Sequence, residues 1–218
     1  MEYSFHIFNK LSADGISLAA DKLLNDRVLG ENNKTTGAGM RSRAISTLNS
    51  AAATQPTHPP VVVCVGSDLA IGDSLGPITG SMLKYKTQGL GAFIYGTLSA
   101  PVTAKEIKYM QSFLKRTHAN EQVLAIDAAV GEKGDIGVMR VTNSPLLPGA
   151  GANKKLGAIG DISVLGIVAE KSLTNYGLLN TTRLNLVYTM AEIISDGISA
   201  LLWERYNQAG TKRTVKQA

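Results

Sequence analysis

The run Val61-Val-Val-Cys-Val65 constrains the fold of this chain more than any other feature. It holds five consecutive apolar residues, four of them β-branched. A strand that is apolar on both faces is typical of the centre of a parallel sheet covered by helices on both sides. The run ends in a Gly-rich loop, Gly66–Pro77, and Ile78–Tyr85 then reads as a helix with Pro77 favourable in its first turn. The sequence therefore predicts a strand–loop–helix unit here.

The same alternation of strand and helix continues along the chain. Further strands are predicted at Ala92–Tyr95, Val123–Ile126, Ile136–Val141 and Ile162–Val168, and further helices at Val102–Arg116 and Thr182–Tyr206. Strands that alternate with helices pair in parallel. We therefore expect a three-layer α/β/α sandwich with a mostly parallel sheet.

The residues before Pro59 differ in character from those that follow. Ile16 to Leu24 and Ile45 to Ala52 have helical spacing, but Asp26–Gly39 between them is polar and has no apolar period. We predict a helical and flexible extension over residues 1–60, an α/β domain over 61–206 and a mobile basic tail over 207–218. On this interpretation, the chain without residues 1–57 still folds.

Composition excludes several classes of site. Cys64 is the single cysteine, which rules out an intrachain disulfide and any metal site built from several thiolates. The net charge is +5, of which the end of the chain supplies three charges without an acid, so the body gives no reason to expect nucleic-acid binding. No signal peptide and no apolar stretch of membrane-spanning length is apparent, so a cytoplasmic protein is expected. There is no G-x-G-x-x-G, Walker A, HExxH or CxxC motif.

Two aspartates follow predicted buried strands. Asp73 lies in the loop after the first strand, and Asp127 directly follows Ile126. Ligands of open parallel sheets bind outside the carboxyl ends of the strands, and both aspartates are expected at that rim. Two desolvated neighbouring carboxyls split their pKa values, as acid–base catalysis requires. From composition and spacing alone, a helix cap is the favoured interpretation of each aspartate taken singly.

Several short motifs occur together in one order. They are Gly66-Ser-Asp-Leu-Ala-Ile-Gly-Asp-Ser-Leu-Gly-Pro77, Tyr95–Val102, Ala125-Ile-Asp-Ala-Ala-Val-Gly131, Ser144–Asn153, Ile159–Ile162, Gly166–Val168 and Asn180–Leu184. Over roughly residues 61–206 this order resembles the YyaC-type sporulation proteins. That family is similar to the germination protease of spores and to the hydrogenase maturation endopeptidases, which share the expected fold.

The resemblance implies a catalytic pair. In both groups of peptidases an acidic residue of the first Gly-rich loop and an Asp after a later strand form the active site, which corresponds to Asp73 and Asp127. The maturation enzymes add a histidine and a metal, but none of the three histidines lies near Asp161–Gly166. We therefore expect a metal-free, cofactor-free pair.

Weaker candidates border the predicted cleft. Asp68 shares the first loop, Asn153 and Asp161 border the long Pro/Gly-rich loop, and Arg183 precedes the last helix. These residues are predicted to contact substrate, and Asp161 is the first candidate for a third ligand if a metal binds.

Three functions stay open at this level. The first is a sporulation-associated endopeptidase, acting on a peptide or protein such as a spore protein in the cytoplasm of a sporulating cell or in a spore compartment. The second is a catalytically inactive protein that binds a partner in the same cleft. The third, small-molecule or nucleotide binding at the sheet rim, rests on fold analogy alone.

Overall fold

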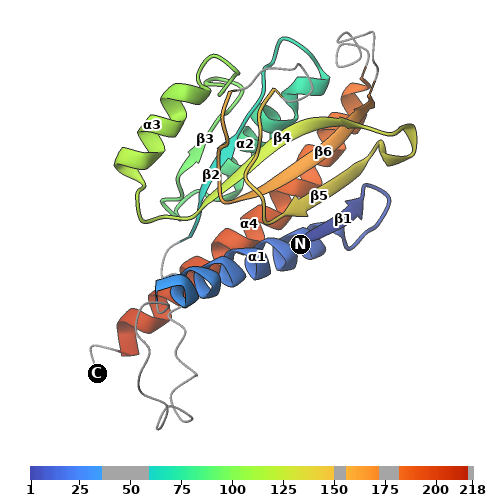
Figure 1. Ribbon diagram of the computed structural model, residues 1–218. Helices are drawn as coiled ribbons and strands as arrows, with labels where there is room; N and C mark the ends of the chain where they lie inside the picture. Colours follow the sequence, from blue (N-terminus) through green and yellow to red (C-terminus); the bar gives the residue numbers. More distant parts are fainter. Residues whose placement is uncertain (36–58, 150–155, 172–181, 216–218) are drawn as a thin grey trace.

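A computed structural model describes residues 1–35, 59–149, 156–171 and 182–215 (Figure 1). Within these ranges a single sheet of six strands has the order β1-β5-β6-β4-β2-β3. The elements are β1 (Glu2–His6), α1 (Ser12–Thr35), β2 (Val61–Cys64), the 3₁₀ turn η1 (Gly72–Ser74), α2 (Leu75–Lys86), β3 (Ile94–Tyr95), α3 (Ile107–Thr117), β4 (Val123–Gly131), the 3₁₀ turn η2 (Lys133–Asp135), β5 (Val138–Thr142), β6 (Ile162–Glu170) and α4 (Leu184–Val215).

The centre of the sheet is parallel, as the apolar strands predicted. β3, β2, β4 and β6 run in the same direction, with Val62 opposite Leu124 and Leu124 opposite Ile162. All four residues of β2 are buried. β5 and β1 extend this sheet in antiparallel pairing.

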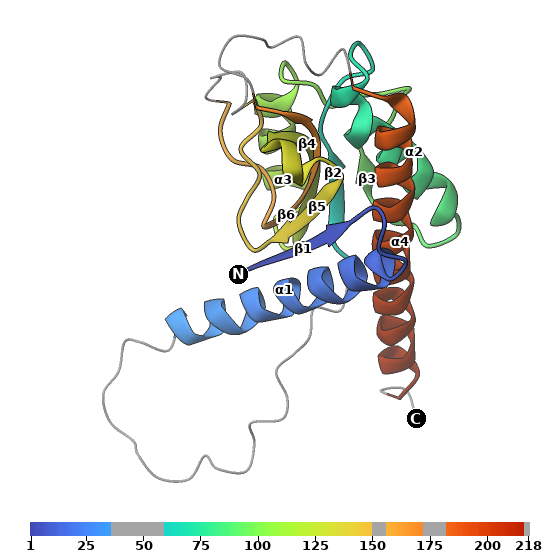
Figure 2. The same ribbon diagram turned by 90° about the vertical axis from the view of Figure 1, so that its right-hand side faces the viewer.

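Helices cover both faces of the sheet. α1, α2 and α4 pack on the face formed by Val62, Cys64, Leu124 and Ile126. α3 packs on the other face, over Val61, Val63, Val123 and Ala125. Figure 2 shows the sheet between α2 and α4 on one side and α3 on the other. The three-layer α/β/α architecture with a mostly parallel sheet is therefore confirmed.

The prediction that residues 1–60 form an extension outside the core is wrong for its described part. β1 pairs with β5 along its whole length, with Phe5 opposite Met139. α1 has the helical spacing that the sequence indicated, but Ile16, Leu23 and Leu24 of this helix are fully buried against α4. An amphipathic helix shows that it has a buried face without showing which element covers that face.

Two boundaries also differ from the sequence-based expectation. α1 continues to Thr35, through most of the segment that was predicted to be a loop. α4 continues to Val215, so the predicted basic tail is largely helical. The helix predicted over residues 45–52 lies outside the described residues.

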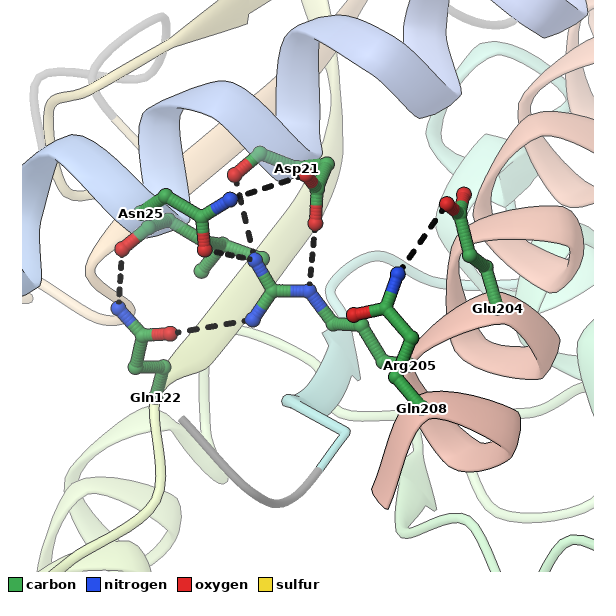
Figure 3. A network of polar contacts seen from close by, with 7 residues as sticks. Asp21, Asn25, Gln122, Glu204, Arg205 and Gln208 are labelled. Carbon is green, nitrogen blue, oxygen red and sulfur yellow. Dashed lines mark hydrogen bonds and ion pairs between the residues drawn. The ribbon is translucent and has the colours of Figure 1, made fainter. Parts of the chain in front are cut away.

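Arg205 connects the last helix to the first through a network of polar contacts (Figure 3). Its Nε donates to Asp21 Oδ1 at 2.8 Å and its Nη2 to Asn25 Oδ1 at 2.9 Å. Gln122, just before β4, accepts a longer bond from Nη1 at 3.5 Å and donates to Leu24 O at 2.8 Å. The buried guanidinium thus joins α4, α1 and the start of β4.

α4 is also the one described helix that is long and apolar enough to cross a membrane by composition alone, over Leu184–Ala209. Half of its most apolar window is buried inside the protein. Packing against α1 and α2 accounts for this apolar face, as in the core helix of an α/β domain.

Candidate active site

Glycines fold the first loop tightly back onto the end of β2. Gly66 has a φ of +140°, and a Cβ atom there would lie 2.1 Å from the carbonyl oxygen of Asp73. A Cβ atom on Gly76 would lie 1.9 Å from the carbonyl oxygen of Val65. The N–H of Ser67 donates to Asp73 O at 3.1 Å. Because side chains are excluded at both glycines, η1 lies directly above the end of β2 with Asp73 in it.

Asp127 lies where β2 leaves the sheet. β2 accompanies β4 as far as Cys64 opposite Ile126, and the N–H of Val65 donates to Ile126 O at 2.7 Å. The prediction that β4 ends at Asp127 is wrong, since β4 continues beside β6 to Gly131. From Asp127 onward β4 is therefore paired with β6 on one side, and β2 no longer pairs with it on the other.

Electrostatics connect the two aspartates. Burial raises the pKa of Asp127 well above its usual range, and the negative charge of Asp73 raises it further. The Ala128 N–H, 2.8 Å from Asp127 Oδ1, opposes this effect only in part. Burial likewise raises the pKa of Asp73, against a hydrogen bond from Ser67. The charge of Asp73 thus acts on the Asp127 carboxyl, and burial raises the pKa of both groups.

No compensating cation accompanies this pair among the described residues. The ion pairs of the described chain do not include Asp73 or Asp127. No group of three or more His, Cys, Asp or Glu side chains gathers anywhere in the same residues. His118 bonds to the Tyr95 hydroxyl at 2.8 Å, and Cys64 is buried, which raises the pKa of its thiol. Two carboxylates alone are a poor site for a transition metal.

Asp161 lies at the wrong end of the sheet for the role predicted from the sequence. It precedes β6 and accepts a hydrogen bond from the N–H of Val123, the first residue of β4, at 2.8 Å. Its other carboxylate oxygen is 3.1 Å from the Arg27 guanidinium. Asp127 is paired with Leu165, four residues further along β6, or about 13 Å away at ~3.3 Å per residue. Asp161 is therefore a structural residue and no candidate third ligand.

The other weak candidates have different outcomes. Asp68 is exposed in the same loop as Asp73. Arg183 is exposed just before α4, and its side chain has no hydrogen bond or ion pair within the described ranges. Asn153 lies outside the described residues. Contact of these three with a substrate stays a prediction.

The register of the strands identifies neighbours of Asp127 that the sequence did not predict. Asp127 is opposite Leu165, Leu165 is opposite Arg140, and Arg140 is opposite Ser4. Directly opposite residues project from the same face of a sheet, so these four form one row that runs from the aspartate to the edge strand. Arg140 also forms an ion pair with Asp135 at 2.7 Å. The alternation Glu2-Tyr-Ser-Phe-His6 was the available signal for β1, but nothing in the sequence indicated its place beside β5.

A groove of about 440 Å³ lies on the opposite face of the sheet. It is lined by α2 and α4, with Met82, Tyr85 and Tyr188 among its residues. Asp127 shares its face with Val123 and Ala125, beneath α3. The groove is therefore separate from the carboxyl pair.

Comparisons with known proteins extend the similarity to the N-terminal side of the residues 61–206 that carried the resemblance in the sequence. A family described as "Protein of unknown function (DUF1256)" matches residues 34–197. The chain is 42% identical over 142 residues to a Bacillus subtilis (strain 168) protein named "Uncharacterized protein YyaC", covering 65% of this chain and 68% of that protein. Among solved structures, a [NiFe] hydrogenase maturation protease HycI from Thermococcus kodakarensis KOD1 is similar, with a TM-score of 0.42, 16% identity, and 66% of this chain and 93% of that chain covered. The family match spans most of the chain, from the end of α1 into α4, and on this basis the protein belongs to the DUF1256 family.

Proposed function

We propose that this protein is an endopeptidase that hydrolyses peptide bonds with water activated between Asp73 and Asp127. The observation that supports it most is the pairing of two desolvated carboxyls without a cation in the described chain. Such an arrangement is unfavourable for stability, and strongly perturbed pKa values concentrate at functional sites.

The pair supplies both an acid and a base. Asp127 has the more strongly raised pKa and holds the shared proton, while Asp73 is ionised. Asp73 takes a proton from water as the water oxygen attacks the peptide carbonyl carbon, and Asp127 donates its proton to the carbonyl oxygen. When the tetrahedral intermediate collapses, Asp73 returns its proton to the leaving amine. Asp127 recovers one from the hydroxyl that becomes a carbonyl again, so the enzyme is regenerated.

The biological setting of the proposal follows from the family resemblance. A sporulation role, a germination-protease-like mechanism and a cytoplasmic or spore-compartment location are parts of the proposal. The substrate is a peptide or protein, with a spore protein as the first candidate.

The test is cleavage by the purified full-length protein. Small acid-soluble spore proteins and an unfolded general protein substrate are each incubated with wild type in EDTA, and fragments are identified by mass spectrometry. Asp127→Asn and Asp73→Asn are expected to lower the cleavage rate by about 10²- to 10⁴-fold, the usual contribution of general acid–base catalysis. Asp196→Asn is the matched control, because Asp196 pairs with Lys86 on the other face of the sheet.

Each result separates the hypotheses. Loss of activity in EDTA with recovery on adding nickel or zinc would overturn the metal-free mechanism. Absence of cleavage under every condition favours the alternative in which the fold is kept and the same cleft binds a partner. Full activity in Asp127→Asn would exclude this pair as the catalytic centre.

A further inference from the structure

The outer edge of β1 has unpaired backbone groups. β1 pairs with β5 on one side and is the last strand of the described sheet. The N–H of Asn143 donates to Met1 O, and the N–H of Ile7 donates to Gly137 O, so the odd-numbered residues bond to β5. Since the direction alternates along an antiparallel strand, the N–H and C=O groups of Glu2 and Ser4 point outward.

His6, by contrast, has only its N–H available at this edge. Its carbonyl oxygen already accepts bonds from Asn9 N at 2.9 Å and Ser12 Oγ at 2.8 Å. An edge that offers free donors and acceptors over the length of a strand is a template for a further strand.

Exposed apolar side chains flank the same edge. On α1, a Cβ atom on Gly15 would lie 2.3 Å from the ring of Phe5, and Lys22 Nζ lies 5.8 Å from the centre of the Tyr3 ring. Leu18 lies between Gly15 and Lys22 on the same face of the helix, next to β1, and is nevertheless 70% exposed. The edge of β1 therefore has a hydrophobic neighbour that no described residue covers.

Both ends of the strand are also apolar and open. Met1 is 64% exposed before β1, and Phe8 is 85% exposed after it. These residues, together with Leu18, are exposed apolar groups around an unpaired backbone edge whose one charged residue is Glu2, a combination typical of an interaction surface.

We propose that the edge of β1 pairs with β1 of a second copy of this chain, in antiparallel orientation about a two-fold axis at Ser4. In this register Glu2 lies opposite His6 of the second copy, and Tyr3 lies opposite Phe5 of the second copy. The first pair joins an acid to an imidazole and the second joins two aromatic rings, so the sequence is complementary to itself. Phe8 is brought next to Met1 of the second copy, as a sulfur–aromatic contact.

The symmetry also places both α1 helices on the same face of the extended sheet. The two Leu18 side chains then approach each other beside the axis and leave the solvent. An isologous interface of this kind uses one patch twice, which is how most homodimers are built. This interface leaves Asp73, in the turn after β2, and Asp127, within β4, outside the contact.

The register makes a specific cross-linking prediction. Directly opposite, hydrogen-bonded residues in antiparallel strands have Cα atoms about 5.5 Å apart, within the range that a disulfide spans. Ser4→Cys in the full chain is expected to form a covalent dimer on mild oxidation, as measured by non-reducing electrophoresis. Cys64 is fully buried and does not compete. Lys108→Cys, on the exposed surface of α3, is the control and is expected to stay monomeric.

Sedimentation velocity supplies the second measurement. Wild type is expected to be a dimer that Ser4→Pro and Leu18→Glu convert to monomer, since proline removes the outward N–H of Ser4 and glutamate places a charge at the axis. Tyr109→Glu, at an exposed position of α3, is expected to leave the dimer intact. A wild-type protein that is monomeric at every soluble concentration would overturn the proposal. So would a dimer that Ser4→Cys does not cross-link.

Discussion

Asp161 lies at the amino end of the parallel strands, and Asp127 lies further towards their carboxyl end. The two carboxyl groups differ in the charges and hydrogen bonds around them. At the amino end, Asp161 is 3.1 Å from the Arg27 guanidinium and accepts the Val123 N–H. At the carboxyl end, Asp127 is 8% exposed and receives one N–H, from its own neighbour Ala128. The charge that acts on its pKa, that of Asp73, has the same sign.

This difference separates residues that hold the fold from residues that do chemistry. A buried charge that serves stability is neutralised by an opposite charge and hydrogen bonds, as Asp161 is and as Arg205 is by Asp21. In the described chain Asp127 has no opposite charge beside it and accepts one hydrogen bond, from the Ala128 N–H, so the fold bears an energetic cost at this position. The comparison makes Asp127 the position where stability and function conflict, and the predictions below test that conclusion.

The largest effect on stability is expected from removing the N-terminal segment that packs against α4. Deleting Met1–Thr35 exposes the surface of α4 that Ile16, Leu23 and Leu24 cover. The truncated chain is expected to lose its cooperative transition in urea and its near-ultraviolet circular dichroism. A cooperative unfolding transition would instead support the domain boundary that the sequence predicted near Pro59.

A matched pair of substitutions in α1 tests the same point without deletion. Leu24→Ala is expected to lower the free energy of unfolding by about 2–5 kcal/mol, because Leu24 is fully buried. Leu18→Ala, 70% exposed on the same helix, is expected to change it by less than about 0.5 kcal/mol in the dilute monomer. Equal effects at both positions would show that α1 does not pack as described.

The next effect concerns Arg205, which is 5% exposed. Arg205→Ala leaves Asp21, Asn25 and Gln122 without their shared donor, and a loss of about 1–3 kcal/mol is expected, because Arg205 is buried but the Asp21 side chain is partly exposed to water. Arg183→Ala is the control, since Arg183 is exposed at the other end of α4. Urea unfolding of the two variants provides the measurement, and similar midpoints would argue against the network.

Local sequence patterns predicted the centre of this fold and failed at its margins. The apolar run at Val61–Val65 suits a strand that is buried on both faces. The strand–loop–helix unit follows from that run and from Gly66 and Gly76. Asp127 was found for the same reason, since an acid after four buried residues stands out. β1 and its place beside β5 depend on contacts between residues more than 130 positions apart, such as Phe5 and Met139, and no periodicity reports such a pairing.

The site was likewise predictable in part. The sequence showed which acidic residues lie near the ends of the predicted strands. It did not show which of them has a cationic partner, because the partner of Asp161 is Arg27, whose helix was predicted to belong to an extension. Leu165 and Arg140 join the row at Asp127 through an antiparallel strand order that sequence alone leaves open.

A direct test of the comparison replaces each aspartate and measures stability at neutral pH. Asp161→Ala is expected to cost about 1–3 kcal/mol, since it leaves the Val123 N–H and Arg27 without their acceptor. Asp127→Asn is expected to leave the free energy of unfolding unchanged or higher, because a neutral amide avoids the cost of ionising a desolvated carboxyl next to Asp73. A larger loss from Asp127→Asn than from Asp161→Ala would reverse the assignment of the two roles.

The smallest and most specific effect is the pH dependence of the difference in unfolding free energy between wild type and Asp127→Asn. The pKa of Asp127 is raised in the folded protein above the value it has in the unfolded chain, so between these two values the folded state binds more protons. The slope of unfolding free energy with pH is then negative, and stability is present below the unfolded pKa and is lost as pH rises through the folded pKa. Wild type is therefore expected to gain stability relative to Asp127→Asn as pH falls from neutral towards 4, by about 1.4 kcal/mol for each pH unit inside that window, and to gain nothing above it.

Urea unfolding of both proteins at matched ionic strength measures the difference. Parallel curves would mean that the Asp127 carboxyl is not desolvated, and a relative loss on acidification would mean that a cation stabilises its charged form after all.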